Sequence, residues 1–173
     1  MNDVYAESAL KYVPKYGTKV LFIAEAPPNS IERYFYFEDV AKGDWLWIGL
    51  MKALYAQDWK ETKEERKRKR WWLAKFSDDG FQLIDAVTEP IGGNSRKRVN
   101  RIKLNTDRLI GGIRETSPKQ IILIKKTVHE ALFEELKSRG LPVLNQNAIP
   151  FPSNGQQTEF NRRLLKLKAA FKF

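Results

Sequence analysis

The sequence predicts an α/β fold, a three-layer αβα sandwich around a central, mostly parallel four-stranded sheet, in a single domain over residues 1–173. Three observations favour this fold. The length of 173 residues suits one domain, and 42% apolar residues are enough for a normal core. Short apolar runs alternate with helical patterns about four times along the chain. Such alternation is typical of parallel strands joined by helices that cover both faces of the sheet.

The first strand is predicted at Val20–Ala24, where five apolar residues follow one another without alternation. Glu25 comes next, and Pro27 and Pro28 then stop the strand because proline has no N–H for the ladder. In open α/β sheets, ligands bind beyond the carboxyl ends of the strands. Glu25 therefore either takes part in chemistry or recognition, or is a loop carboxylate that caps the next helix.

The middle of the chain predicts two helical segments and a second strand. Apolar residues recur at helical spacing over Trp45–Tyr55, which predicts a largely buried helix. Lys60–Lys75 mixes basic and acidic residues and contains the apolar run 71–73, so we expect a solvated helix or flexible insertion with an apolar anchor. Phe81–Val87 follows a turn signal and predicts a strand that ends near Asp85.

The second half predicts three more helices and two strands. Basic and apolar residues interleave from Ser95 to Ile113, so one helix with a basic face is expected, ending at Gly111 and Gly112. A strand at Gln120–Ile124, a helix at Val128–Lys137 and a short strand around 143–144 should follow. A basic amphipathic helix over Glu159–Phe171 is the last predicted element.

Composition restricts the kinds of site and partner. The net charge of +10 favours a polyanionic partner, nucleic acid above all, although it can also serve solubility. Without cysteine, disulfides and thiolate or iron–sulfur sites are excluded, and the single histidine, His129, cannot build a metal site alone. We expect no metal, no cofactor and no membrane contact, because no apolar run approaches the roughly 18 residues of a membrane span. A monomer in the cytoplasm is the expectation.

Several motifs, taken in order, resemble those of the uracil-DNA glycosylase superfamily. The segment Ala24–Pro28 is similar to the family's Gly-Glu-Ala-Pro-Gly-like turn after the first strand. Leu83–Asp85 lies where the family strand ends in a pyrimidine-reading asparagine, and Glu89–Arg96 is similar to the Pro-Gly-Asn-Arg loop that follows. Pro150–Ser153 falls where a His-Pro-Ser loop is expected. The match spans residues 18–171 and implies a DNA glycosylase-like hydrolase that extrudes a damaged or deaminated base.

The departures from the family pattern indicate a divergent member. Ala26 stands where one branch places its water-activating aspartate. Phe151 replaces the histidine that stabilises charge on the departing base, and Asp85 replaces the asparagine. The cluster-bearing branch shares the Glu-Ala-Pro wording but binds iron–sulfur through cysteines, which this chain lacks. Activity therefore does not follow from the resemblance alone.

The resemblance also assigns roles to residues around the first turn. It implies that Glu25 is the catalytic carboxylate, which stabilises an oxocarbenium-like sugar or orients a water. An ionised Asp85 can only accept hydrogen bonds, which weakens a preference for uracil unless burial keeps this side chain protonated. Asn94 either supplies the missing amide or satisfies a turn. The residues expected to contact the flipped base are Phe35 as the stacking ring, Asp85, Asn94, Ala26 and Pro27.

DNA is the expected partner, single- or double-stranded. Two features of the chain suggest the contacts: a basic segment after the second strand and a lysine pair after the third. The expected DNA-binding residues are Arg96, Arg98, Lys125, Lys126, Ser153 and Asn154. Two rival hypotheses are a catalytically inactive nucleic-acid binder on the same fold and a nucleotide-binding α/β protein or transferase. The second rival is disfavoured because no strand leads into a glycine-rich phosphate loop.

Overall fold

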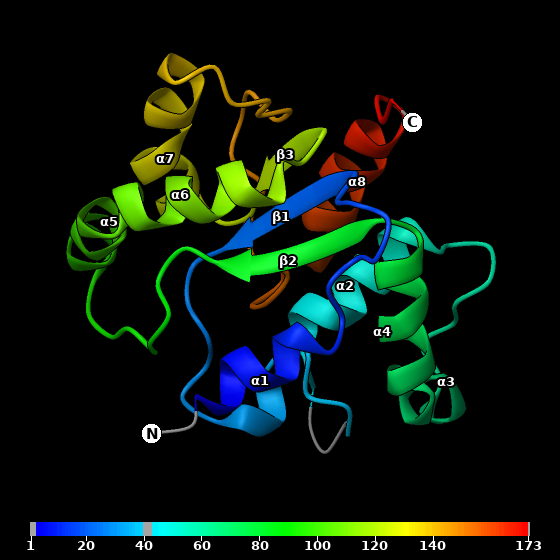
Figure 1. Cartoon of the computed structure of the whole chain (residues 1–173). Coiled ribbons are helices and arrows are strands. Elements are labelled where there is room, and N and C mark those ends of the chain that lie inside the picture. Colours follow the sequence, from blue (N-terminus) through cyan, green and yellow to red (C-terminus); the bar gives the residue numbers. More distant parts are fainter. Residues whose placement is uncertain (1–2, 40–42, 173) are drawn as a thin grey trace.

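The computed structural model describes residues 3–39 and 43–172. This part of the chain folds into an α/β structure with a three-stranded parallel sheet and eight α-helices (Figure 1). The elements follow in the order α1 (Val4–Leu10), β1 (Val20–Ala24), the 3-10 turn η1 (Ile31–Arg33), α2 (Trp45–Leu54), α3 (Lys63–Lys67), α4 (Lys69–Asp78), β2 (Phe81–Asp85), α5 (Ser95–Leu104), α6 (Thr106–Thr116), β3 (Gln120–Leu123), α7 (Lys126–Ser138) and α8 (Gln157–Lys168).

The sheet has the order β2-β1-β3, with β1 in the centre and all neighbours parallel. The register pairs Ala24 with Asp85, so Glu25 and Asp85 leave the same edge of the sheet. Glu25 follows the fully buried apolar run of β1, and Asp85 is the last residue of β2, in which Phe81 and Leu83 are buried. The strand register therefore places the two carboxylates at the same end of neighbouring strands.

The prediction of a fourth strand around 143–144 is wrong for the described residues. Val143 and Ile149 form only isolated parallel bridges, to Ile121 and Ile124. Between them, the side-chain amide of Asn145 accepts from the Leu123 N–H at 2.9 Å and donates to the Leu123 C=O at 3.0 Å. The Asn145 side chain thus pairs with the backbone N–H and C=O of Leu123 at the edge of β3, where a fourth strand would otherwise pair.

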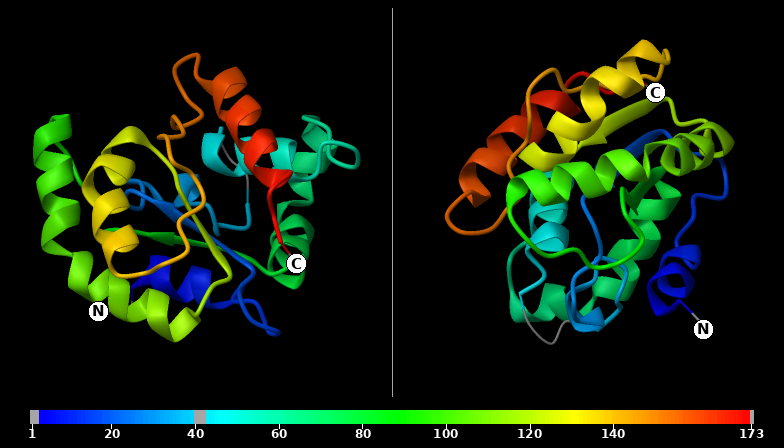
Figure 2. Two further views of the ribbon diagram at one scale, coloured as in Figure 1. Left: turned by 90° about the horizontal axis from the view of Figure 1, so that it is seen from above. Right: turned by 90° about the vertical axis from the view of Figure 1, so that its left-hand side faces the viewer.

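Two apolar clusters lie on opposite faces of the sheet (Figures 1 and 2). Val20 and Phe22 of β1 point to the cluster formed with α2, α4 and α8, whereas Leu21 and Ile23 point to the cluster formed with α5, α6 and α7. This alternation follows from the two-residue period of a strand. Helices on both faces leave the carboxyl edge of the sheet as the place where loops gather.

The helix predicted from Ser95 to Ile113 is two helices, α5 and α6, which are separated at Asn105. The Asn105 side chain donates to the Arg101 C=O at 2.9 Å, which offers the backbone an alternative to continuing α5. Gly111 lies inside α6, so the prediction that this glycine pair ends a helix is wrong. Burial of Leu109 and Ile113 on the sheet outweighs the cost of about 1 kcal/mol for each internal glycine.

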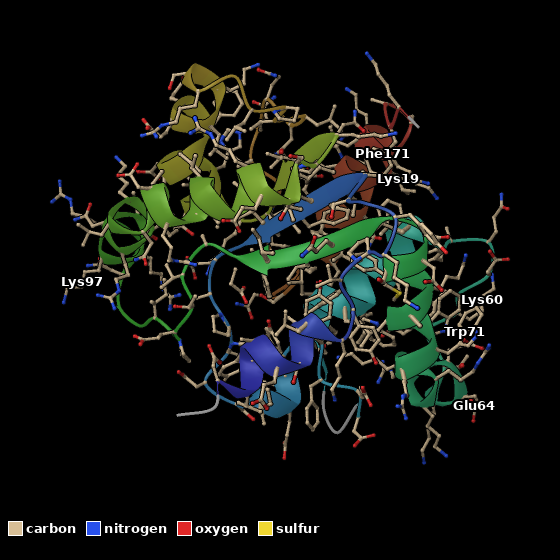
Figure 3. The ribbon with its side chains drawn as sticks, in the orientation of Figure 1. Lys19, Lys60, Glu64, Trp71, Lys97 and Phe171 are labelled. Carbon is tan, nitrogen blue, oxygen red and sulfur yellow. The ribbon has the colours of Figure 1, made fainter. Side chains whose placement is uncertain are left out.

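The charged segment before β2 forms the short helix α3 and then α4. Trp72 and Phe76 of α4 are buried and contact the core, which confirms the apolar anchor. Figure 3 shows that the side chains of Lys60, Glu64 and Trp71 lie on the outside of this region. The segment is therefore packed helix rather than a flexible insertion, because the anchor residues recur at helical spacing.

Candidate functional site

A cavity of about 540 Å³ opens at the carboxyl ends of β1 and β2. Its walls come from seven parts of the chain: the turn after β1, the aromatic segment that follows, the start of α2, the end of β2 with its loop, Arg98 of α5, Lys125 between β3 and α7, and the loop at Phe151. The residues that line it include Glu25, Ala26, Pro27, Arg33, Tyr34, Phe35, Trp45, Asp85, Arg98, Lys125 and Phe151. Loops distant in sequence therefore meet at one pocket.

Glu25 is the most heavily bonded side chain of this cavity. Its Oε2 accepts from Arg98 Nη1 at 2.6 Å and from Lys125 Nζ at 2.5 Å, and its Oε1 accepts from Thr127 Oγ1 at 2.5 Å. Burial alone would raise the pKa of Glu25, but the hydrogen bonds from Lys125 and Thr127 and the charges of Lys125 and Arg98 lower this pKa overall. The carboxylate is thus ionised at neutral pH and held in one orientation.

The charges around Glu25 do not cancel. Arg98 and Lys125 bring two positive charges to one carboxylate, and their side chains are 28% and 31% exposed, whereas that of Glu25 is 7% exposed. Arg33 adds a further exposed cation to the cavity wall. The accessible part of this cluster is therefore positive, which suits the phosphate or another anionic group of a ligand.

Asp85 lies on the same cavity but has the opposite environment. Its carboxyl receives no hydrogen bond from the described residues, and burial, followed by the charge of Glu25, raises its pKa to about 7. It also borders a second cavity of about 240 Å³ between α1 and α6. Near neutral pH, Asp85 is therefore divided between an ionised form and a neutral form that can both donate and accept.

The aromatic segment after the turn is packed more deeply than a stacking role requires. Phe35 lines the cavity but is only 3% exposed, with its ring 4.9 Å from Tyr36 and 5.3 Å from Phe76 between centroids. The Tyr36 hydroxyl donates to the Leu83 C=O at 2.9 Å and accepts from the Leu83 N–H at 2.8 Å. These contacts give the segment a structural role at the edge of β2.

Trp45 is a cavity residue that sequence reasoning missed. It is the first residue of α2, lines the cavity and is 44% exposed, so part of its side chain is accessible to a ligand. Asp44 fixes this position because its carboxylate accepts from the Trp47 N–H at 3.2 Å and caps the helix. The only hint in the sequence was the position of Trp45, an aromatic residue directly after the helix cap Asp44.

The remaining predicted base-contacting residues divide into two groups. Ala26 and Pro27 line the cavity beside Glu25, as expected from their place in the turn. Asn94 does not line it, and its side chain caps α5 by accepting from the Lys97 N–H at 3.1 Å. The turn-forming alternative for Asn94 is therefore the one that the structure favours.

The predicted DNA-binding residues also divide. Arg98 and Lys125 line the cavity, whereas Arg96 and Lys126 are exposed at the starts of α5 and α7 and Lys97 extends away from α5 (Figure 3). The loop before α8 holds a half-buried Ser153, whose N–H donates to the Phe151 C=O, and the exposed Asn154 with φ 51°. Neither loop residue lines the cavity.

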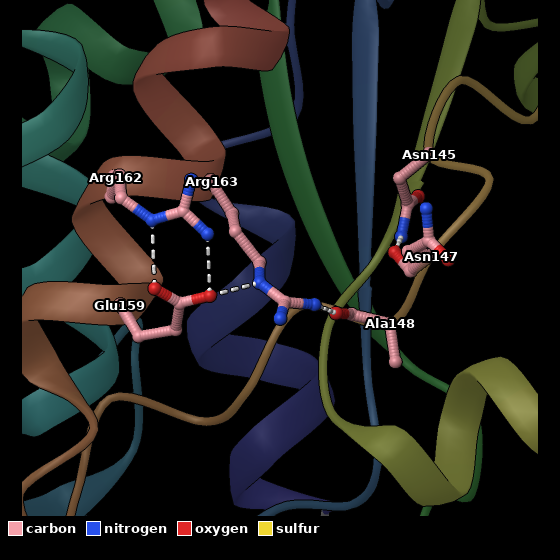
Figure 4. A network of polar contacts seen from close by, with 6 residues as sticks. All are labelled: Asn145, Asn147, Ala148, Glu159, Arg162 and Arg163. Carbon is pink, nitrogen blue, oxygen red and sulfur yellow. Dashed lines mark hydrogen bonds and ion pairs between the residues drawn. The ribbon is translucent and has the colours of Figure 1, made fainter.

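One carboxylate balances part of the positive charge of the arginines of α8. Glu159 accepts from Arg162 Nε at 2.8 Å and from Arg163 Nε at 2.5 Å, and Arg163 also donates to the Ala148 C=O (Figure 4). Their hydrogen bonds and charges lower the pKa of Glu159 to about 2. This helix therefore offers less free positive charge than its composition indicates.

The described residues contain neither a metal-binding cluster nor a membrane-spanning helix, and the sequence has no match among known families or curated proteins. Over residues 3–39 and 43–172, no group of three or more potential metal-binding side chains is found. No helix in the same residues is long and apolar enough to cross a membrane. The sequence matches no model of a known protein family, and comparison with curated proteins gives no match either.

Proposed function

We propose that this protein is a DNA glycosylase-like hydrolase that binds DNA, takes a flipped damaged or deaminated base into the cavity and cleaves its N-glycosidic bond. The observation that carries the proposal is the cavity itself, in which Glu25 and Asp85 meet at the end of the sheet between aromatic and basic walls. Its volume of about 540 Å³ is within the range of small-molecule sites. We also propose that the α/β fold is a three-layer sandwich like that of the uracil-DNA glycosylases.

Each wall of the cavity has a task in such a reaction. The fixed, ionised Glu25 accepts one hydrogen bond at Oε1, from Thr127, and can accept a second from a water that attacks the sugar as the base leaves. A protonated Asp85 both donates and accepts, as an asparagine would, and can therefore read a base edge that has both kinds of group. Trp45 and the half-buried Phe151 line the cavity and supply aromatic rings on which a base can stack, a contact worth about 1–3 kcal/mol per base.

The DNA backbone is assigned to the surface next to the cavity. Arg98 and Lys125 carry the excess charge inside it, and Arg96, Lys97 and Lys126 extend this charge along the starts of α5 and α7. These helices pack on each other beneath the cavity opening, so one strand can contact both while its extruded nucleotide enters. Such contacts are independent of sequence and weaken as salt rises.

The test is base release from defined oligonucleotides. Single- and double-stranded DNA carrying uracil, hypoxanthine, xanthine or mismatched thymine is incubated with the protein, and abasic sites are then cleaved by alkali. We expect release of at least one base, with a rate that falls by about tenfold or more in Glu25→Gln because the amide cannot accept a proton from the attacking water. An unchanged rate in this variant would remove Glu25 from the chemistry.

One observation favours the rival, a nucleic-acid binder without catalysis. The three donors on Glu25 already use both of its oxygens, and Phe151 stands where a histidine was expected to assist the departing base. Salt-sensitive binding of DNA without release of any of the four bases would establish this rival.

A further inference from the structure

Lys125 has a backbone conformation that is unusual for a residue with a side chain. It follows β3 with φ 85° and ψ 142°, a combination found almost only in glycine. Its N–H donates to the Ile149 C=O at 2.7 Å and its C=O accepts from the His129 N–H at 3.1 Å. Strain of this kind persists where the surroundings impose it and is concentrated at functional sites. The result here is a lysine side chain directed to the wall of the cavity.

The amine of Lys125 is paired with a carboxylate at the wall of the cavity. Lys125 Nζ is 2.5 Å from Glu25 Oε2, and Arg98 Nη1 is 2.6 Å from the same oxygen. Glu25 is therefore placed to take one proton from the ammonium group when the amine reacts. The side chain is 31% exposed, so a ligand in the cavity can reach it.

Removal of a base leaves a sugar whose open-chain form carries an aldehyde at C1′. We infer that Lys125 forms a Schiff base with this aldehyde and that the protein is consequently also an abasic-site lyase. This inference rests on the proposed function, because it takes the cavity to hold the sugar of an extruded nucleotide. It assigns a covalent role to a residue that base release by itself does not require.

The steps balance without any oxidant or reductant. Lys125 gives one proton to Glu25, its nitrogen lone pair forms a bond to C1′, and a second proton passes from this nitrogen to the former carbonyl oxygen. Glu25 then returns its proton to the hydroxyl of this carbinolamine, which leaves as water and gives an iminium ion. Ionised Asp85, on the same cavity wall, then removes a C2′ proton, a C2′–C3′ double bond forms, and the C3′–O bond breaks with its electrons leaving on the phosphate. Water hydrolyses the iminium ion and restores the amine.

The experiment uses DNA in which the abasic site has been made beforehand, so it does not depend on base release by this protein. The full chain is incubated with the abasic oligonucleotide and sodium cyanoborohydride, which reduces an iminium ion to a stable amine. Covalent adduct is measured on a denaturing gel, and peptide mapping by mass spectrometry identifies the modified residue. Two variants accompany the wild type: Lys125→Arg, which keeps the cation next to Glu25, and Lys60→Arg as the control at an exposed lysine before α3.

We expect an adduct on Lys125, a loss of about tenfold or more in Lys125→Arg and the wild-type yield in Lys60→Arg. Absence of adduct in the wild type would overturn the inference, as would an adduct mapped to another lysine. An equal yield in Lys125→Arg would also overturn it. If base release fails in the oligonucleotide assay while the adduct forms on Lys125, the proposed glycosylase function is lost and the Schiff-base chemistry stands.

Discussion

Two acid–base contacts close to the cavity differ in how their charges balance. In the core, Lys69 is completely buried, with Nζ 2.5 Å from Asp44 Oδ2 and 3.2 Å from the Tyr34 C=O. One cation meets one anion there. At the cavity wall, Glu25 alone meets two partly exposed cations, Arg98 and Lys125. The core pair has no charge left for a ligand, whereas the wall cluster does.

The difference shows how a structural ion pair is distinguished from a binding site. Lys69 and Asp44 join α4 to the cap of α2 and to the aromatic segment, so they hold the wall in place without touching solvent. Burial lowers the pKa of Lys69, and Asp44 opposes this only in part. In contrast, the excess charge and partial exposure at Glu25 are retained for a partner. Stability should therefore respond mainly to the first pair and function mainly to the second cluster.

The largest expected effect is on stability, in Lys69→Met. This change leaves Asp44 as an uncompensated buried charge, so the free energy of unfolding should fall by about 3–5 kcal/mol in denaturant titrations. Lys67→Met, at an exposed position of α3, is the matched control and should change it by less than about 0.5 kcal/mol. The double variant Asp44→Asn, Lys69→Met should recover part of the loss. A loss of under 1 kcal/mol in Lys69→Met, on the order of an exposed pair, would contradict the contrast.

The next effect concerns pH and Asp85, the unpaired carboxyl of the cavity. Its pKa is raised from 3.8 to about 7 by burial and by Glu25, so the folded state prefers the protonated form. The stabilising contribution is complete below the unfolded pKa and is lost as pH rises through 7. Asp85→Asn should abolish this loss. Its unfolding free energy relative to wild type should therefore rise by about 1 kcal/mol or more between pH 4 and pH 8.

The same protonation gives a functional expectation for the wild type. If neutral Asp85 reads the base, uracil release should slow as pH rises from 6 to 8, and Asp85→Asn should remove this dependence. Initial rates at saturating enzyme over this range would measure it. A decline of equal size in both proteins would assign the titration to another group.

The smallest expected effect compares two basic surfaces. Arg96 and Lys97 have no ion-pair partner among the described residues, whereas Arg162 and Arg163 are held by Glu159. Arg96→Ala with Lys97→Ala should reduce the slope of log affinity for DNA against log salt by about 1 for each lost phosphate contact. Arg162→Ala with Arg163→Ala should change this slope less. Fluorescence anisotropy with one labelled duplex over a salt series separates the two, and equal slopes would show that α8 contributes as much as α5.

Much of the fold could be predicted because it depends on local patterns. Val20–Ala24 and Ile121–Leu123 are continuous apolar runs that lie in buried parallel strands, as their lack of alternation predicts. The proline stop after β1 puts Glu25 at the carboxyl edge, and the register brings Asp85 to the same edge. The sequence could not predict that Asn145 would use a side-chain amide where a fourth strand was expected, because that replacement depends on its distance from Leu123.

By itself, the sequence determined the α/β class, the edge of the sheet where the loops meet, and the excess of positive charge. Periodicity and composition are properties of neighbouring residues, so they can be read without coordinates. Only the tertiary structure decided that Arg98 and Lys125 share one oxygen of Glu25. It also decided that the Asp85 carboxyl accepts no hydrogen bond from the described residues. Trp45 is exposed and Phe35 is buried for the same reason. Exposure and protonation depend on groups up to a hundred residues apart along the chain, and only folding brings these groups together.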